Sequence, residues 1–475
     1  MLFHRLDYLV FLTVAVAGYW ALVRAGRPTL RTVFLLVASC LFYAAWHPVY
    51  LTLILGSTLL DFVAGRRIGA SDSPRVRRRW LLASLVGNLG LLGLFKYFNF
   101  FSTAVGQGLG LLGISVTPPL LDVLLPVGIS FYTFQSLSYT IDVYRRKLEP
   151  TDSFLHFATF VTLFPQLVAG PIVRASELLP QLRERPTLDP ERVGSALFLI
   201  ATGLVKKVAV ADFLSVNLVD RVFDNPEAYT ATEVVVALYG FTMQIYCDFS
   251  GYTDVARGSA RLLGLELPEN FDRPYQARNP AEFWRRWHMT LSTWLRDYLY
   301  FPLGGSRVAP WRAYWNLWLT MFLIGLWHGA AWTFVLYGIL QATAMVLHRW
   351  WFRRSGRPRG APDPWPVHAF KVFLSLQFVV FSRILFRASD LDNAWAVTER
   401  LWSGQRSLAQ VAPSVWLVLV GSFVAHYLPR RWFDALAARF VALPAPAQGL
   451  ALAAVGAALA RIATSQVVPY IYFQF

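Results

Sequence analysis

The sequence predicts an all-α, polytopic membrane protein with about 11–12 transmembrane helices and additional re-entrant and interfacial helices. Composition is the first observation behind this prediction. Of the 475 residues, 56% are hydrophobic and 16% are aromatic, and the mean hydropathy is +0.43. A single soluble core of this length needs far less apolar surface. The second observation is that apolar runs recur from one end of the chain to the other.

These apolar runs are the candidate spans, because a transmembrane helix needs about 20 mostly apolar residues. The runs before a long polar gap are 8–23, 32–46, 49–64, 80–94, 120–143, 157–172, 194–210 and 234–246. The runs after it are 314–347, 367–385, 415–427 and 449–460. The first run lacks a convincing small-residue cleavage site, so we expect an uncleaved anchor.

Basic residues gather in particular connecting segments between these runs. The clusters are Arg24, Arg27 and Arg31; Arg66, Arg67, Arg75, Arg77, Arg78 and Arg79; Arg145, Arg146 and Lys147; and Arg349, Arg353, Arg354, Arg357 and Arg359. By the positive-inside rule these segments face the cytoplasm, which places the N-terminus outside. The net charge of +16 therefore reflects orientation and contact with lipid headgroups, and we expect no nucleic-acid partner.

His328, in Trp327-His328-Gly329, lies inside the apolar run 314–347. A charged side chain at membrane depth costs roughly 2.5 kcal/mol or more on insertion scales, so by default it indicates a functional site. Gly325 and Gly329 bracket the motif and weaken helix there, as in cavity-lining membrane segments. The alternative is a histidine that only packs in the bundle.

The polar gap 248–312 carries most of the other polar candidates. After several prolines, helical periodicity resumes at Ala281 and predicts one amphipathic helix suited to the membrane interface. Its inward face comprises Trp284, Trp287, His288, Leu291, Trp294, Leu295 and Tyr298, and its outward face comprises Arg285, Ser292 and Arg296. His288 is either a site residue or an interfacial histidine packed among tryptophans.

Two further segments, 126–131 and 164–171, place Pro and Gly inside apolar runs, which predicts re-entrant or kinked elements. They contribute the polar residues Ser130 and Gln166. A role in lining a tunnel and a role in packing are equally compatible with the pattern. Cys40 and Cys247 are the two cysteines, so neither a disulfide framework nor a metal site is expected.

These motifs resemble those of the membrane-bound O-acyltransferase family, especially its bacterial alginate O-acetylation subgroup, with the teichoic-acid D-alanylation proteins more distantly similar. The matching segments are 126–144, 164–174, 244–254, 270–305, 325–333 and 470–475. This chain departs from the resemblance twice. Cys247 replaces an aromatic residue, and 381–388 reads Phe-Ser-Arg-Ile-Leu-Phe-Arg-Ala where relatives tend to show Trp-Val-Phe-Phe-Arg-Ala.

The resemblance implies one integral-membrane domain, 1–475, built around a central tunnel. Its parts are N-terminal helices in 1–115, a core with both histidine motifs in 116–350, and C-terminal helices in 351–475. The implied activity is O-acyl transfer in the bacterial inner membrane. No bound cofactor is expected, acetyl-CoA is the expected donor, and the implied partners are a periplasmic acetyltransferase and an exported polysaccharide such as alginate.

His328 is the implied catalytic residue and His288 the second polar position of the site. A hydroxyl is a poor nucleophile at neutral pH, and neutral imidazole, with an ordinary pKa of about 6.5, can remove its proton. We therefore expect His328 to act as base and His288 to orient or stabilise the developing oxyanion. The expected tunnel-lining residues are Trp327, Asp248, Ser250, Tyr252, Gln166, Ser130 and Trp287, and the expected donor-phosphate contacts are Arg285, Arg286 and Arg278.

Two other classes remain open on composition alone. A multi-span transporter also has intramembrane polar residues and broken helices, but it predicts internal repeats, and none is visible in the sequence. A second alternative keeps the enzyme and changes the reaction to D-alanyl transfer, or to acylation of a lipid or peptidoglycan.

Overall fold

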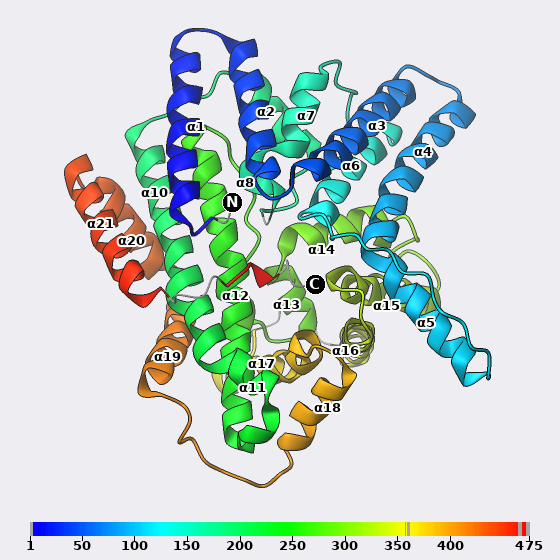
Figure 1. The fold of residues 1–475 in the computed structure, drawn as a ribbon, viewed down its shortest axis with the longest axis vertical. Helices are drawn as coiled ribbons and strands as arrows, with labels where there is room; N and C mark the ends of the chain where they lie inside the picture. Colours follow the sequence, from blue (N-terminus) through cyan, green and yellow to red (C-terminus); the bar gives the residue numbers. More distant parts are fainter. Residues whose placement is uncertain (1–2, 169, 357, 359–361, 464–467, 472–475) are drawn as a thin grey trace. The chain divides into compact units, whose positions relative to one another are not determined.

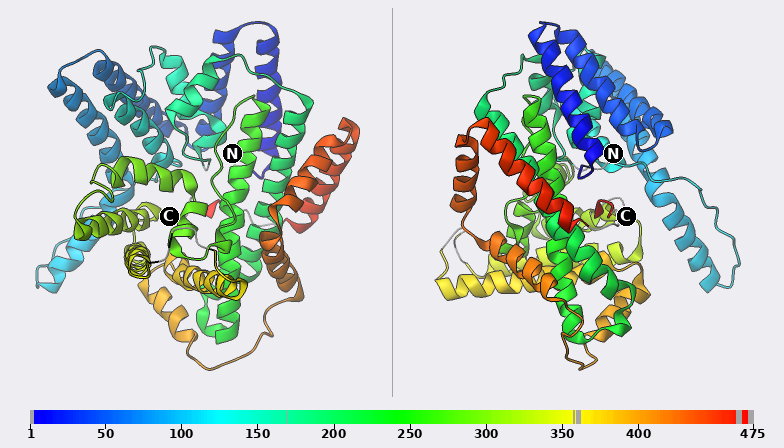
Figure 2. Two further views of the ribbon diagram at one scale, coloured as in Figure 1. Left: turned by 180° about the vertical axis from the view of Figure 1, so that it is seen from behind. Right: turned by 60° about the vertical axis from the view of Figure 1, so that its left-hand side comes forward.

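The computed structural model describes residues 3–168, 170–356, 358, 362–463 and 468–471, and these ranges contain helices and no β-strand (Figures 1 and 2). The chain divides into two compact units. Unit 1 comprises Met1–Asp189 and Ser259–Pro268, and unit 2 comprises Pro190–Gly258 and Glu269–Phe475. The all-α architecture predicted from the sequence is confirmed.

Unit 1 contains the N-terminal helices. They are α1 (Leu6–Arg24), α2 (Pro28–Ala44), α3 (Leu51–Gly69), α4 (Pro74–Leu92), α5 (Phe98–Leu111), α6 (Ile129–Tyr144), α7 (Phe154–Thr162), α8 (Phe164–Leu167) and α9 (Ala175–Arg183). A short 3₁₀ turn, Pro48–Tyr50, precedes α3, and a π-helical turn, Gly93–Tyr97, joins α4 to α5. Helix α3 packs on both α4 and α6, and α2 packs on α1 and α7.

Unit 2 contains the remaining helices, apart from the last turn of α12. They are α10 (Pro190–Leu204), α11 (Asp220–Asp224), α12 (Ala231–Leu262), α13 (Pro280–Arg286), α14 (Met289–Leu295), α15 (Pro310–His328), α16 (Trp332–Arg354), α17 (Trp365–Arg387), α18 (Leu391–Arg400), α19 (Pro413–Tyr427), α20 (Arg430–Ala442) and α21 (Ala445–Ile462). Short 3₁₀ or π-helical segments occupy Val205–Asp212, Ser215–Val219, Pro226–Ala228, Pro274–Gln276 and Arg296–Tyr300. Helices α15 and α16 form a hairpin, and α16 packs on α17.

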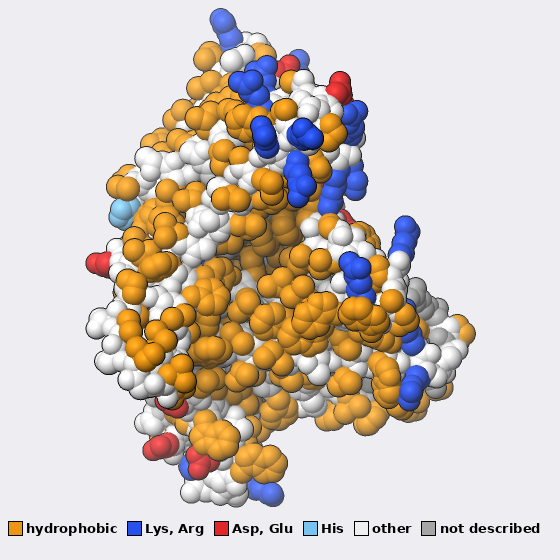
Figure 3. All heavy atoms as spheres, turned by 90° about the vertical axis from the view of Figure 1, so that its right-hand side faces the viewer, with side chains coloured by type: hydrophobic (Ala, Val, Ile, Leu, Met, Phe, Trp, Pro, Cys, Tyr) orange, Lys and Arg blue, Asp and Glu red, His pale blue; other side chains and the backbone are white. Residues whose placement is uncertain are grey.

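Five described helical segments are long and apolar enough to cross a membrane by length and composition. They are Leu6–Arg24, Pro48–Gly69, Pro74–Leu111, Trp365–Arg387 and Ala445–Ile462, and Pro28–Ala44 and Pro413–Tyr427 are shorter apolar helices. Hydrophobic side chains cover most of the face drawn in Figure 3, and most of the Lys and Arg side chains gather in its upper part and along its right-hand side. The protein is a multi-pass membrane protein, and the number of crossings stays a prediction.

Two of the predicted basic clusters meet at one end of unit 1. The Arg77 guanidinium, at the start of α4, donates to the carbonyl oxygens of Val143 (3.2 Å) and Tyr144 (2.8 Å) at the end of α6. Arg146 pairs with Asp72 of the α3–α4 connection at 3.1 Å. This shared end is what the positive-inside argument expects. Which side of the membrane it faces stays a prediction.

The structure corrects three helix boundaries. The polar gap predicted to begin at residue 248 lies partly within α12, which runs for 32 residues to Leu262. The run 120–143 becomes helical only at Ile129, and the run 314–347 is interrupted between His328 and Trp332. A helix can continue through polar side chains when residues of neighbouring segments pair with them. Hydropathy alone therefore misplaces such helix boundaries.

The single amphipathic helix predicted from Ala281 is wrong, because the backbone breaks at Trp287 and His288. Helix α13 ends at Arg286, Trp287 is extended, and α14 begins at Met289. The predicted inward face is nonetheless buried, and Arg285 and Arg296 are exposed. Periodicity therefore identified which side chains point inward but missed the interruption.

Candidate active site

His328 is the last residue of α15, where the helix gives way to the turn before α16. Gly329 is extended, with φ −163° and ψ 155°. A Cβ on Gly325 would lie 2.3 Å from the Cα of Gly338, so the two helices approach at backbone distance one turn before His328. The glycines of this motif thus permit the close hairpin that positions the histidine.

The His328 ring is enclosed by aromatic side chains and is 2% exposed. Phe386 of α17 meets it edge-on with ring centroids 5.0 Å apart, and Trp327 lies at 5.2 Å. Tyr337 and Phe334 of α16 follow at 6.2 and 6.5 Å. Such a shell excludes water and holds the imidazole in a fixed orientation.

His288 is fully buried and occupies the residue before α14 in a left-handed conformation, with φ 43° and ψ 55°. Residues with a Cβ rarely adopt this conformation, and such strain persists only where the surroundings enforce it. Here the segment around Asn270 supplies the constraint. Met289 N–H donates to the Asn270 carbonyl oxygen at 2.9 Å, and Asp272 N–H donates to that of Arg286 at 2.9 Å.

The hydrogen bonds of Asn270 also define the tautomer of His288. The Asn270 Oδ1 atom accepts from the Thr290 backbone N–H (3.2 Å) and hydroxyl (2.9 Å), which identifies it as the amide oxygen. His288 Nδ1 lies 3.1 Å from the same oxygen. Because a carbonyl oxygen only accepts, Nδ1 carries the proton in the neutral ring and Nε2 carries the lone pair.

Trp327 brings the two histidines together. Its ring lies 5.5 Å from that of His288 and 5.2 Å from that of His328, with a T-shaped arrangement in both pairs. Phe249 of α12 covers His288 from another side at 4.8 Å. Two histidines that are far apart in the sequence therefore share one aromatic cage in the interior of unit 2.

Asp248 and Tyr252 lie beside this cage and make structural contacts. Asp248 pairs with Lys207 at 2.7 Å and accepts the backbone N–H of Ile471 at 2.8 Å. Tyr470 packs on Tyr252 at 4.5 Å and on Phe249 at 5.6 Å. These contacts anchor Tyr470 and Ile471 beside Phe249, which packs on His288. Ser250, on the same helix, is buried, and residues 472–475 of the terminal motif lie outside the described residues.

Trp287 and the three predicted phosphate-binding arginines lie in or beside α13. Trp287 is 1% exposed and stacks on Phe283 with centroids 5.6 Å apart. Arg278 and Arg286 both pair with Glu282, at 2.9 Å each. Asp363 lies 3.8 Å from Arg278 and Asp272 lies 3.7 Å from Arg286, so carboxylates already balance both charges. Arg285 is exposed.

Ser130 and Gln166 belong to unit 1, whereas the histidines belong to unit 2. Gln166 is fully buried and its Nε2 donates to the Phe160 carbonyl oxygen at 2.6 Å. Gly128, with φ 75°, approaches so closely that a Cβ there would meet the Leu167 carbonyl oxygen at 2.4 Å. The two predicted re-entrant elements therefore pack against each other within unit 1.

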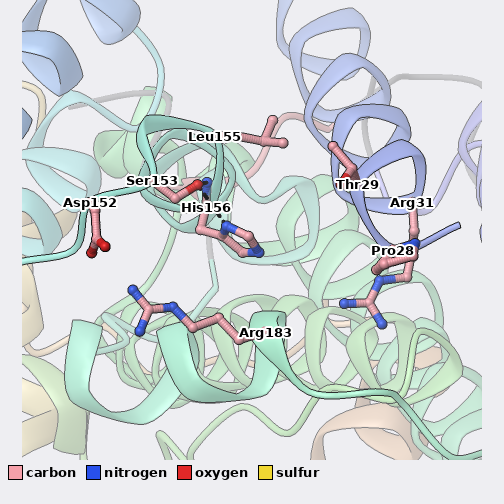
Figure 4. Close-up of a pocket in the computed structure, with 8 residues that line it drawn as sticks. All are labelled: Pro28, Thr29, Arg31, Asp152, Ser153, Leu155, His156 and Arg183. Carbon is pink, nitrogen blue, oxygen red and sulfur yellow. Dashed lines mark hydrogen bonds between the residues drawn. The ribbon is translucent and has the colours of Figure 1, made fainter.

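Unit 1 also contains an open pocket of about 550 Å³ (Figure 4). It is lined by Pro28, Thr29, Arg31, Asp152, Ser153, Leu155, His156 and Arg183. Arg31 caps α9 through its guanidinium, which donates to the carbonyl oxygens of Leu182 (2.7 Å) and Glu184 (2.9 Å). His156 Nδ1 lies 2.8 Å from the Ser153 hydroxyl. None of the residues proposed from the sequence lines this pocket.

Three residues of the site were missed by the sequence reasoning: Asn270, Lys207 and Arg383. Lys207 and Arg383 carried a detectable signal, because each is a charged residue inside an apolar run. Asn270 carried none, since an asparagine between two prolines is ordinary loop composition. Asn270 acts through its contact with His288, which is 18 residues away in the sequence and comes close only in the folded protein.

Comparison with known proteins identifies the family of the chain. The family model for the membrane-bound O-acyltransferases matches residues 146–389, which contain both histidines and the helices around them. The chain belongs to the membrane-bound O-acyltransferase family. The resemblance seen in the sequence is therefore confirmed, and the protein is an O-acyltransferase rather than a transporter.

Individual members of the family extend the match over most of the chain. The probable alginate O-acetylase AlgI of Pseudomonas aeruginosa is 38% identical over 89% of this chain and 80% of its own length. The peptidoglycan O-acetyltransferase of Helicobacter pylori is 35% identical over 82% of this chain and 77% of its own length. The teichoic acid D-alanyltransferase of Bacillus subtilis is more distant, at 24% over 56% of this chain and 70% of its own length.

Proposed function

We propose that this acyltransferase moves acetyl groups from a thioester donor toward the hydroxyl groups of an exported polysaccharide, with His328 and His288 at the reaction centre. The observation that carries the proposal is the cage around Trp327, with its ring 5.5 Å from His288 and 5.2 Å from His328. An acyl transfer between a thioester and a hydroxyl needs a base and an orienting group in one water-poor site. This cage holds two imidazoles in such a place.

In the proposed reaction His328 is the general base. It removes the proton of the acceptor hydroxyl while the hydroxyl oxygen bonds to the thioester carbonyl carbon. The C–S bond then breaks, and the leaving thiolate takes the proton back from His328. Proton transfer by a positioned base typically contributes about 10² to 10⁴ in rate.

His288 has a narrower role in this proposal than the sequence indicated. With Nδ1–H directed to Asn270, the neutral ring offers Nε2 as an acceptor. An acceptor can hold the proton of the incoming hydroxyl, but it cannot donate a hydrogen bond to a developing oxyanion. We therefore assign His288 to orienting the acceptor, and the oxyanion needs a different donor.

Acetyl-CoA is the proposed donor, the bacterial inner membrane the proposed location, and a periplasmic acetyltransferase the proposed partner that completes transfer to the polymer. The basic clusters at one end of unit 1 support a cytoplasmic face where a polyanionic thioester would arrive. The alginate O-acetylase relatives support acetyl as the group and a polysaccharide as the destination. Arg285, which is exposed, is a better proposed phosphate contact than the paired Arg278 and Arg286.

The test is the O-acetyl content of secreted polysaccharide in a strain that lacks the gene and is complemented at equal membrane expression. Wild type is expected to restore the ester, and His328→Ala to lower it by at least about 10²-fold. His368→Ala, an exposed histidine of the same unit, is the matched control and should restore it fully. Full acetylation with His328→Ala would refute the assignment of the base.

The peptidoglycan O-acetyltransferase relative makes cell-wall glycan a second candidate acceptor. The same strains distinguish the two, because ester can be measured separately in purified secreted polysaccharide and in purified peptidoglycan. Ester restored only in peptidoglycan would replace the acceptor and leave the proposed chemistry intact. D-alanyl ester in place of acetyl would replace the donor.

A further inference from the structure

Arg383 of α17 is a buried cation with an unusual environment. It is 1% exposed and lies on a helix with the length and composition of a membrane span. Among the described residues no carboxylate lies within 4.0 Å of it, and its Nε and Nη2 atoms have no hydrogen-bond partner. A buried charge without a counter-ion is costly and by default indicates function.

The other buried cations in the described part of the chain are compensated. Lys207 pairs with two carboxylates, Asp212 at 2.6 Å and Asp248 at 2.7 Å. Arg77 donates to four carbonyl oxygens, and Arg31 donates to two. Arg383 therefore differs from them in keeping two guanidinium nitrogens available for something that is not protein.

Aromatic groups hold the guanidinium in place. Its Cζ atom lies 4.8 Å from the centroid of the Trp287 ring and 5.2 Å from that of Phe386. Cation–π contacts stabilise the charge without using its in-plane N–H groups, so the donors stay available.

These contacts join Arg383 to both histidine motifs. Trp287 directly precedes His288, and Phe386 packs on the His328 ring at 5.0 Å. Helix α17 approaches the cage through these two rings. The arginine is thus joined to His328 through the Phe386 ring and contacts the residue that precedes His288.

We propose that Arg383 donates from Nε and Nη2 to the acyl oxygen during transfer and stabilises the oxyanion. The inference rests on the proposed acyl transfer. When the acceptor oxygen bonds to the carbonyl carbon, the C=O electron pair moves onto the acyl oxygen, and it returns as the C–S bond breaks. Neutral His288 cannot donate to that oxygen, whereas a guanidinium offers two parallel N–H groups and a full positive charge.

The experiment uses the full-length protein in lipid nanodiscs and follows thiol release from acetyl-CoA at a series of concentrations. Arg383→Met is expected to lower kcat and kcat/KM together by about 10² to 10³, with KM within about threefold of wild type. Arg383→Lys, which keeps the charge but loses the planar pair of donors, should fall between the two. Arg431→Met, an exposed arginine of the same unit, is the control and should match wild type.

Stability separates this role from a structural one. Replacing an uncompensated buried charge by an apolar side chain of similar length should leave the thermal unfolding midpoint unchanged or raise it. A lower midpoint, or a variant that cannot be isolated from the membrane, would show that the charge is structural and would overturn the proposal. So would an increase confined to KM, which indicates binding of a substrate anion, or activity equal to wild type.

His328→Ala, assayed in parallel, separates this inference from the proposed function. An active His328→Ala with an inactive, stable Arg383→Met would refute the base and keep the oxyanion role. The reverse pattern would refute the oxyanion role alone. If wild-type protein does not cleave acetyl-CoA, the proposed identity of the donor is wrong. The variants are then compared by the acyl-ester content of cells, measured relative to the content that wild type restores. In that assay a stable Arg383→Met that restores less than a tenth of the ester supports the inference, and one that restores all of it overturns it.

Discussion

The buried polar residues of unit 1 and those of unit 2 have different surroundings. In unit 1, Asp61 of α3 accepts from the Ser84 hydroxyl at 2.5 Å and from Asn88 Nδ2 at 2.9 Å, and Ser84 lies 3.0 Å from Thr140 of α6. Helices α3, α4 and α6 are therefore held together by polar side chains that hydrogen-bond to one another. In unit 2 the polar groups nearest the reaction centre are surrounded by rings instead.

This difference indicates which polar residues hold the fold and which do chemistry. A carboxylate that accepts several hydrogen bonds gains nothing from a further ligand. A guanidinium enclosed by aromatic side chains is held rigidly, while its N–H groups remain available for a reacting group. Unit 2 contains both kinds, because the Lys207 cluster is compensated and Arg383 is not.

The largest effect on stability is expected at Lys207. Lys207→Met leaves Asp212 and Asp248 buried without their cation, which should destabilise the protein by about 3–5 kcal/mol. It should also loosen the chain end, because Lys207 donates to the Val468 carbonyl oxygen at 3.3 Å. Thermal unfolding in nanodiscs measures the first effect, and protease sensitivity of a C-terminal tag measures the second.

The control for that change is the exposed Lys147. Lys147→Met should change the unfolding midpoint by no more than about 1 °C, because surface substitutions have small effects. A Lys207→Met protein as stable as wild type would show that the triad is not the compensated cluster described above, and it would weaken the contrast between Lys207 and Arg383.

Asn270 and Asn88 provide a matched pair across the two units. Asn270→Ala removes the acceptor that fixes the His288 tautomer, so acetyl transfer should fall by about 10- to 100-fold. Asn88→Ala removes a donor to the buried Asp61 carboxylate, so it should cost about 1–3 kcal/mol of stability with activity per folded molecule retained. Initial rates normalised to folded protein, together with unfolding midpoints, give both readings.

The expected pattern is therefore crossed, with activity lost at one asparagine and stability lost at the other. Two variants that lose activity only in proportion to folded protein would remove the distinction between the units. Asn270→Asp is a useful addition, because its carboxylate still accepts from Nδ1–H and should recover much of the rate.

The smallest effect concerns pH and Glu282. Burial alone would raise the pKa of Glu282, but hydrogen bonds from Arg278 and Arg286 outweigh burial and hold it below the ordinary value of 4.5. A carboxyl whose pKa is lower in the folded state stabilises the protein above its unfolded pKa, and this contribution is lost as the pH falls through the folded pKa. Because Arg278 and Arg286 are both partly exposed to solvent, the contribution should be at most about 1 kcal/mol.

Unfolding midpoints between pH 7 and about pH 3.5 measure this contribution. The unfolding midpoint of wild type should decrease as the pH falls below about 4.5. The midpoint of Glu282→Gln should be lower at pH 7 and should decline less steeply as the pH falls. Parallel curves for the two proteins would show that the arginine pairs do not depress this pKa.

The sequence by itself determined the membrane class, the helical architecture and the family. These follow from hydropathy, from basic clusters and from local motifs such as Trp327-His328-Gly329, each of which is carried by residues close together in the chain. It also identified the buried face of the segment around His288, because a periodicity of 3.6 survives a break in the helix when both halves face the same core.

Tertiary structure decided the rest. The break at Trp287 and His288 depends on the clamp of Asn270, the continuation of α12 past Cys247 depends on partners such as Lys207, and the cation site depends on Trp287 and Phe386 meeting around Arg383. Each is a contact between residues distant in the chain. In each case a contact with a distant residue offsets the cost of backbone strain or of burying a polar group. A local sequence pattern cannot predict such a contact.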